Sequence, residues 1–240
     1  MRLLNRLSLA VDAYWIQIKD RIIQSGNFNR KTNSSVDSIL TEYNLDVEQL
    51  QFFTNAINTN TRGIDIVLNG TWKIKKSTLG VMLGANFTRT RLFGEIKTAD
   101  NLTPDSLNSQ TLFGRLDRTR VEQGQPDHKI ILTLNYKTGR FGFLLRNTLF
   151  GNTTIASIPF PNDPSFDELF SSKIITDISI DYSPKKWFTL TAGVNNMFDV
   201  YPDRIKNYVN SGEGQFIYGM EASPFGFNGG YYFMNMSFNF

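Results

Sequence analysis

Apolar and polar residues alternate with a period of two along most of the chain. The C-terminal stretch YYFMNMSFNF shows this most clearly, because Asn235, Ser237 and Asn239 separate apolar side chains. Strict alternation over this length predicts a β-strand with one apolar and one polar face. The pattern predicts about eight strands of roughly ten residues, the length that a tilted strand needs to cross a bilayer. They are expected at residues 7–23, 61–72, 78–88, 128–136, 140–150, 173–182, 187–198 and 231–240.

The connections between these strands alternate between short and long. Short turns are expected at residues 73–78, 137–140 and 183–186, and long connections at residues 24–53, 92–127, 151–172 and 199–229. Outer-membrane β-barrels have this arrangement, because their periplasmic turns are short and their extracellular loops are long. The sequence therefore predicts an all-β fold, an antiparallel transmembrane β-barrel segment of about eight strands.

Aromatic residues at the strand ends beside the short turns agree with this fold. A barrel carries an aromatic girdle at each membrane interface. On one side that girdle is expected to comprise Trp72, Tyr136, Tyr182 and Trp187. The short turns also carry lysine and arginine, which suit either the solubility of a turn or contact with lipid phosphates.

Two segments admit more than one interpretation. In residues 7–23 the apolar positions change phase around Trp15. This change predicts either a β-bulge near Tyr14 and Trp15 or passage of the strand out of the membrane. Residues 46–57 have apolar residues at helical spacing, yet they also suit an outward extension of the following strand, which we favour.

Composition narrows the class of protein further. Aromatic residues make up 13% of the chain, yet the mean hydropathy is only −0.26. No apolar run reaches the length of about 18 residues that a transmembrane helix needs. The net charge of +3 is scattered, so no nucleic-acid partner is expected. Without cysteine and with His128 as the only histidine, neither thiol chemistry nor a metal site is expected.

Charged residues on the predicted polar faces are expected to lie in the barrel lumen. Asp65, Asp177 and Asp181 occupy such positions. Opposite Arg146 or Arg89, they would form a charge ladder across the interior. Glycosidases instead use two carboxyl groups roughly 5–10 Å apart, placed for acid and base chemistry. We therefore do not expect an enzyme.

Four segments carry a resemblance to a known family. In the third of them, Met197 stands where the motif usually has leucine. The segments are residues 11–22 (VDAYWIQIKDRI), 52–69 (FFTNAINTNTRGIDIVLN), 193–203 (GVNNMFDVYPD) and 223–240 (SPFGFNGGYYFMNMSFNF). They are similar to strand motifs of the TonB-dependent receptors, the large ligand-gated barrels of the bacterial outer membrane. The resemblance covers nearly all of the chain.

The resemblance implies a barrel of about 22 strands with a plugged lumen, of which residues 1–240 would be one partial domain. It also implies import of a siderophore-iron, haem, cobalamin or similar ligand. TonB would act only through the plug, and no cofactor is expected. The sequence shows no plug, TonB box or signal peptide, so we expect a fragment that does not transport alone. The alternatives are a complete small eight-stranded anchor or adhesion barrel and a soluble β-sandwich binding module.

Two sets of residues are candidates for function. Aromatic residues of the long loops are expected either to bind ligand or to pack within the loops: Phe160, Phe166, Tyr208, Phe216, Tyr218 and Phe225. The resemblance also implies a C-terminal signal for the barrel-insertion machinery, with an aromatic last residue and apolar residues at every second position before it. Its residues, which would also contact outer-membrane lipid, are Tyr232, Met234, Met236, Phe238 and Phe240.

Overall fold

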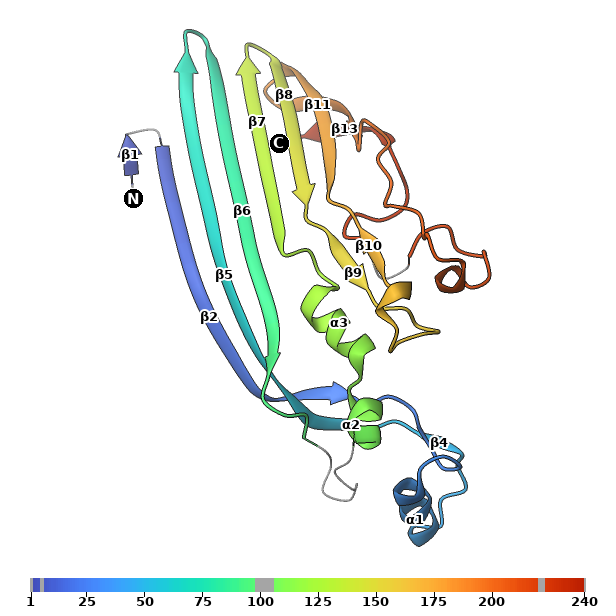
Figure 1. Cartoon of the computed structure of the whole chain (residues 1–240). Helices are drawn as coiled ribbons and strands as arrows, with labels where there is room; N and C mark the ends of the chain where they lie inside the picture. The colour runs from blue at the N-terminus through green and yellow to red at the C-terminus, as the bar shows by residue number, and fades with distance from the viewer. Residues whose placement is uncertain (1, 5–6, 98–105, 220–222, 240) are drawn as a thin grey trace.

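The computed structural model describes residues 2–4, 7–97, 106–219 and 223–239. Within them, nine strands form one antiparallel sheet that follows the order of the chain (Figure 1). These strands are β1 (Arg2–Leu4), β2 (Leu7–Gln24), β5 (Phe53–Ile74), β6 (Ser77–Phe93), β7 (His128–Thr138), β8 (Phe141–Phe150), β11 (Lys173–Lys185), β12 (Phe188–Asn195) and β13 (Tyr231–Phe238). The edge strands β1 and β13 do not pair with each other, so the sheet is open.

The strand register joins the alternating residues of eight strands into two continuous faces. One row of directly opposed residues crosses the sheet: Leu7, Gly70, Val81, Leu134, Leu145, Ile178, Val194 and Tyr232. We call this side the apolar face. The other side, the polar face, carries Asp65 opposite Asn86 and Arg146 opposite Asp177. The predicted antiparallel segment of about eight transmembrane strands is thereby confirmed.

The strands differ in length more than the sequence pattern predicts. β2, β5 and β6 contain 18, 22 and 17 residues, whereas β12 and β13 contain 8 each. The predicted length of roughly ten residues is therefore wrong for the first three strands. Their backbones continue to pair beyond the apolar segment, because main-chain N–H and C=O groups form the hydrogen-bond ladder whatever the side chains.

The change of phase in β2 does not come from a bulge at the predicted place. Tyr14 and Trp15 pair without interruption with Gly63 and Arg62, and the register shifts instead between Ile18 and Ile22. The bulge predicted near Tyr14 and Trp15 is therefore wrong. Passage out of the membrane remains, and it agrees with the arrival of Arg62 on the apolar face at this level.

Short turns and long loops lie at opposite ends of the sheet (Figure 1). The described short turns are residues 75–76, 139–140 and 186–187. Lys75 and Gly139 have positive φ angles of 54° and 57°, which two-residue hairpins favour. The predicted alternation of short and long connections is confirmed. Aromatic contacts border the short turns, among them Phe141 with Tyr182 at 5.0 Å and Trp187 with Phe238 at 6.2 Å.

The long loops contain secondary structure that the sequence pattern did not predict. Their elements are β3 (Phe28–Asn29), α1 (Ser34–Glu42), β4 (Gln49–Leu50), α2 (Ser106–Leu112), α3 (Arg115–Gln123), β9 (Thr153–Ile155), η1 (Pro164–Phe166), β10 (Glu168–Phe170) and η2 (Tyr208–Ser211). Residues 53–57 belong to β5, so the strand interpretation of that part is confirmed. In the described part of the chain, every helix is too short or too polar to cross a bilayer.

The main cluster of buried apolar residues lies at the loop end of the sheet. It comprises Phe28, Val36, Leu40, Ala56, Ile57, Leu112 and Phe113. α1 contributes Val36 and Leu40, and Asn33 caps this helix by accepting a hydrogen bond from the Val36 amide at 3.1 Å. The loops are therefore packed structures with a core of their own.

Candidate functional site

Hydrogen bonds join the four long loops side by side into one layer. We call the described parts of residues 25–52, 94–127, 151–172 and 196–230 the loop layer. The first two loops meet where the Gly26 amide donates to the Thr111 carbonyl at 3.0 Å. The Asn33 and Asn108 side chains are also 2.5 Å apart, and Asn108 is 2% exposed. These buried contacts hold α1 beside α2.

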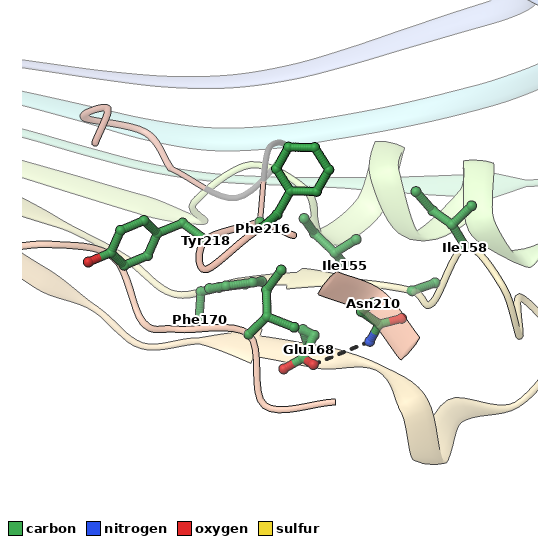
Figure 2. A pocket seen from close by; sticks show the side chains of 10 residues that line it. Ile155, Ile158, Glu168, Phe170, Asn210, Phe216 and Tyr218 are labelled. Carbon is green, nitrogen blue, oxygen red and sulfur yellow. Dashed lines mark hydrogen bonds between the residues drawn. The ribbon is translucent and has the colours of Figure 1, made fainter. Parts of the chain in front are cut away.

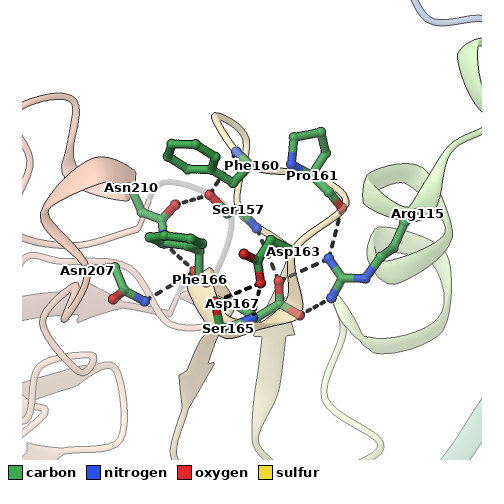
Figure 3. Close-up of polar contacts among 10 residues, drawn as sticks. All are labelled: Arg115, Ser157, Phe160, Pro161, Asp163, Ser165, Phe166, Asp167, Asn207 and Asn210. Carbon is green, nitrogen blue, oxygen red and sulfur yellow. Dashed lines mark hydrogen bonds and ion pairs between the residues drawn. The ribbon is translucent and has the colours of Figure 1, made fainter.

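Arg115 joins the second loop to the third (Figure 3). Its guanidinium donates to the Pro161 carbonyl at 2.9 Å and to the Asp167 carboxylate at 3.1 Å, and a second nitrogen also contacts Asp167. The side chains of Arg115 and Asp167 are 28% and 18% exposed, so this pair is partly shielded from water. Two-point contact of a guanidinium with a carboxylate fixes direction as well as distance.

Glu168 joins the third loop to the fourth (Figure 2). Its carboxylate accepts hydrogen bonds from the amides of Asn207 at 2.7 Å and Lys206 at 3.3 Å, and from the Asn210 side chain at 3.2 Å. Glu168 is only 4% exposed, and burial of a carboxylate is costly unless its oxygens find donors. Beside it, Ser157 donates to the Asn210 side chain at 2.6 Å.

A small cavity of about 90 Å³ lies between the third and fourth loops. Its wall is largely apolar, with Ile155, Phe170, Phe216 and Tyr218, and Glu168 and Asn210 form its polar end (Figure 2). Pockets that enclose a whole ligand measure roughly 300–1,000 Å³. The cavity can therefore take one substituent of a larger molecule held across the loop layer.

The structure brings only some of the predicted loop aromatics together. Phe216 and Tyr218 line the cavity. Phe160 stacks on Phe166 with ring centres 4.6 Å apart, outside the cavity lining. Tyr208 is 66% exposed on η2, and Phe225 packs on Phe150 at 5.6 Å.

The sequence reasoning missed the residues that organise the cavity. Glu168 and Phe170 lie on a three-residue strand, β10, which is too short to show a period. Asn210 forms hydrogen bonds with residues more than 40 positions away in the sequence, and its side-chain amide donates to the Phe166 carbonyl at 2.7 Å. No local sequence signal marks any of these three residues.

Lys173, at the start of β11, anchors the beginning of the fourth loop. Its ammonium donates to Asp203 at 2.5 Å, and Ser171 donates to the same carboxylate from its amide and its hydroxyl, both at 2.6 Å. Burial favours the neutral acid, but these hydrogen bonds outweigh burial and lower the pKa of Asp203 from 3.8 to about 2. The contact therefore remains ionised throughout the physiological range.

The polar face of the sheet partly confirms the expected charge ladder. Asp177 lies directly opposite Arg146. Asp65 accepts from Asn86 at 2.5 Å, and Asp181 accepts from Thr191 at 2.7 Å.

The expected lumenal position of Arg89 is wrong. Arg89 lies opposite Arg62, in phase with Ile64 and Phe87 on the apolar face. This position follows from the period of the strand, because Arg89 is two residues beyond Phe87 and side chains at i and i+2 point to the same face. Within the described residues, no group of three or more His, Cys, Asp or Glu side chains could hold a metal ion.

The terminal strand presents its apolar side chains on the apolar face. Tyr232, Met234, Met236 and Phe238 are opposite Val194, Ala192, Leu190 and Phe188 of β12, respectively. The four side chains are between 51% and 85% exposed. Phe240, the last predicted residue of the insertion signal, lies outside the described residues.

An antiparallel sheet with one apolar face, short turns at one end and folded loops at the other is a segment of an outer-membrane β-barrel. The family model described as "TonB dependent receptor-like, beta-barrel" matches residues 2–197, and the chain belongs to this family. The protein is therefore located in the bacterial outer membrane, with its apolar face towards lipid and its polar face towards the lumen.

Solved structures show the same fold at low sequence identity. The outer membrane transporter YddB from Escherichia coli aligns with 100% of this chain and 31% of its own, with a TM-score of 0.60 and 11% identity. The FrpB iron transporter from Neisseria meningitidis aligns with 82% of this chain and 25% of its own, with a TM-score of 0.52 and 16% identity.

The ferripyoverdine receptor of Pseudomonas aeruginosa, solved with ferripyoverdine bound, aligns with 84% of this chain and 22% of its own. Its TM-score is 0.50 and its identity 15%. The chain thus spans less than a third of the length of each of these proteins. No curated protein sequence matches it.

Proposed function

We propose that the chain supplies the C-terminal strands and outer loops of a receptor that imports a siderophore-iron, haem, cobalamin or similar ligand. The observation that carries the proposal is the loop layer, which is hydrogen-bonded from the first loop to the fourth and holds an apolar cavity with a polar end. A packed layer at the mouth of a barrel can hold a ligand before import. The iron transporter and the ferripyoverdine receptor of similar fold support iron as the cargo.

The open sheet supports a larger barrel over a complete small one. An eight-stranded barrel closes when its first and last strands pair. Here β13 pairs with β12 alone among the described strands, and β1 and β2 stand at the opposite edge. We therefore propose further strands and a plug in the working receptor, with energy delivered through TonB to that plug. The proposed role is binding and transport, without catalysis.

Uptake measurements test the receptor proposal. Cells carrying the intact protein should accumulate one of four radiolabelled probes: ferrichrome, ferric enterobactin, haemin or cyanocobalamin. A protonophore should abolish accumulation and leave surface binding in place, because import and not binding requires the proton gradient. Failure of the intact protein to bind any of the four probes above the level of deletion cells would refute the proposal for the ligand classes that these probes represent.

Substitutions in the cavity test which residues hold the ligand. The double variant Phe216→Ala and Tyr218→Ala should weaken surface binding of the accumulated probe by about tenfold or more, because aromatic residues that fill a pocket carry much of the binding energy. Tyr43→Ala, in the first loop and 63% exposed, is the matched control. Equal affinities for the double variant and the control would contradict a role of these residues in ligand binding.

We propose that the terminal strand also carries the insertion signal. Deletion of Phe240 should lower the amount of receptor in the outer membrane, because the insertion machinery would meet an asparagine at the last position. Phe240→Tyr keeps the aromatic ring and should insert normally. Quantitative surface labelling measures both variants, and unchanged surface levels in the deletion variant would argue against the signal.

A further inference from the structure

A basic row crosses the apolar face at the level where β5 and β6 extend beyond the membrane. Arg62 lies directly opposite Trp15 on one side and Arg89 on the other. Arg62 also lies within 5.4 Å of the centre of the Trp15 ring, in a cation–π arrangement. The next row towards the membrane runs from β2 to β7 and contains the apolar residues Ala13, Ile64 and Phe87, followed by His128.

The two arginines have no anionic partner among the described residues. Like charges on directly opposed strand positions repel one another. Arg91 is the next residue outward on the same face, and its charge is neutralised by an ion pair with Glu122 at 2.9 Å. No such ion pair neutralises Arg62 or Arg89 within the described part of the chain. Their positions therefore favour an anion from outside the protein.

The height of the row places it at the membrane boundary. Trp72, beside a short turn, marks the opposite boundary on the same strand and face. The ten residue-to-residue steps from Trp72 to Arg62 span about 34 Å along a strand. At a tilt of about 40° this corresponds to a height of about 26 Å, close to the apolar band of about 25 Å in outer-membrane barrels. Arg62 and Arg89 thus lie at the level of lipid headgroups.

The surface around the row is shaped for the headgroup end of a lipid. A shallow depression of about 710 Å³ is lined by Trp15, Arg62, Phe87, Arg89, Asp127 and His128, among others. The Asp127 carboxylate is 2.7 Å from the His128 ring nitrogen and forms no ion pair with either arginine. Phe87 and His128 stack with ring centres 6.2 Å apart and form the border with the apolar rows. Aromatic residues at such a border suit the interface between acyl chains and headgroups.

We propose that Arg62 and Arg89 bind the phosphate of an anionic lipid headgroup in the outer leaflet, with Trp15 and Phe87 against the start of its acyl chains. Guanidinium groups suit this ligand, because their planar donors can contact phosphate oxygens at two points. The Asp127 carboxylate contacts His128, so the lipid phosphate would supply the anion that contacts the two arginines directly. It would also order β2, β5 and β6 at the level where they leave the membrane.

The first test compares two lipids on the unaltered protein. The purified protein, in a neutral detergent, is titrated with fluorescent lipid A that carries two phosphates and with the same lipid after removal of both. We expect the phosphorylated lipid to bind about thirtyfold more tightly, as about 1 kcal/mol for each of two arginines implies. Equal affinities, or full displacement by millimolar inorganic phosphate, would overturn the proposal of a lipid headgroup site.

The second test locates the site. The double variant Arg62→Gln and Arg89→Gln should lose the preference for the phosphorylated lipid and keep the affinity for the dephosphorylated one. Arg91→Gln, which disrupts an ion pair on the same face, is the matched control and should keep the preference. Heat-dependent gel mobility identifies folded protein, on which all affinities are measured. A folded double variant that retains the full preference would refute the assignment.

Discussion

Replacing Gly193 by alanine should destabilise the sheet by about 3 kcal/mol, at the upper end of the range for overpacked positions. Gly193 lies on the polar face of β12, directly opposite Phe233. A Cβ atom at this position would lie 2.6 Å from the Phe233 ring and 2.7 Å from the Ile178 carbonyl oxygen. The ring can rotate away, but the carbonyl belongs to the β11 backbone, so the strands must move apart.

A second glycine of the polar face provides the control for Gly193→Ala. A Cβ atom on Gly84 would meet no atom within 4 Å, so Gly84→Ala should not destabilise the sheet and should add at most about 1 kcal/mol of stability. Denaturant unfolding of the full protein in lipid vesicles measures both variants.

A further change separates the two contacts of Gly193. Adding Phe233→Ala to Gly193→Ala should recover only part of the loss, because the contact with the Ile178 carbonyl remains. A Gly193→Ala protein as stable as the Gly84→Ala protein would show that β11 and β12 are not packed as described.

Replacing Glu168 by alanine should release the fourth loop from the third. The change leaves the amides of Lys206 and Asn207 without their acceptor in a buried site. Hydrogen bonds to a charged group contribute about 1.5–3 kcal/mol each, and unpaired buried donors add a penalty. We expect the free energy of opening of residues 206–210 to fall by about 3 kcal/mol, which corresponds to roughly hundredfold faster amide exchange. Hydrogen exchange with mass spectrometry measures this effect.

An exposed ion pair in the first loop is the matched control for Glu168. Glu48 is 2.6 Å from Lys31, and their side chains are 72% and 71% exposed. Exposed pairs contribute little, so Glu48→Ala should leave exchange near wild type. Glu168→Gln keeps one acceptor oxygen and should have an intermediate effect. If residues 206–210 exchange at the same rate in Glu168→Ala and wild type, the carboxylate does not hold the loop.

The hydrogen bonds of Glu168 also connect the loop layer with the proposed ligand binding. Asn210 and Glu168 form the polar end of the cavity, while Phe216 and Tyr218 follow on the same loop. Glu168→Ala should therefore weaken probe binding and also speed amide exchange in residues 206–210. The Gly193→Ala change acts within the membrane segment and destabilises the barrel wall itself. Comparison of the two variants thus separates effects on the loop layer from effects on the barrel wall that carries it.

The amino-acid sequence by itself determined the membrane-spanning part of this protein. A side chain on a strand points to one of two faces, so alternation such as that in β13 decides which residues meet lipid. The alternation of short and long connections also follows from the chain alone, since turn residues such as Gly139 permit tight hairpins. Both features depend on neighbours only a few residues apart.

Only the tertiary structure decided the loop contacts and the pairing of Arg62 with Arg89 across the apolar face. Glu168 contacts Asn207, 39 residues away in the sequence, and Arg115 contacts Asp167, 52 residues away. No local periodicity in the sequence predicts these contacts. Arg62 and Arg89 belong together only because the β5–β6 register places them opposite one another, next to the apolar pair Ile64 and Phe87. Register and loop packing arise from backbone pairing and burial over long separations, which no short stretch of sequence specifies.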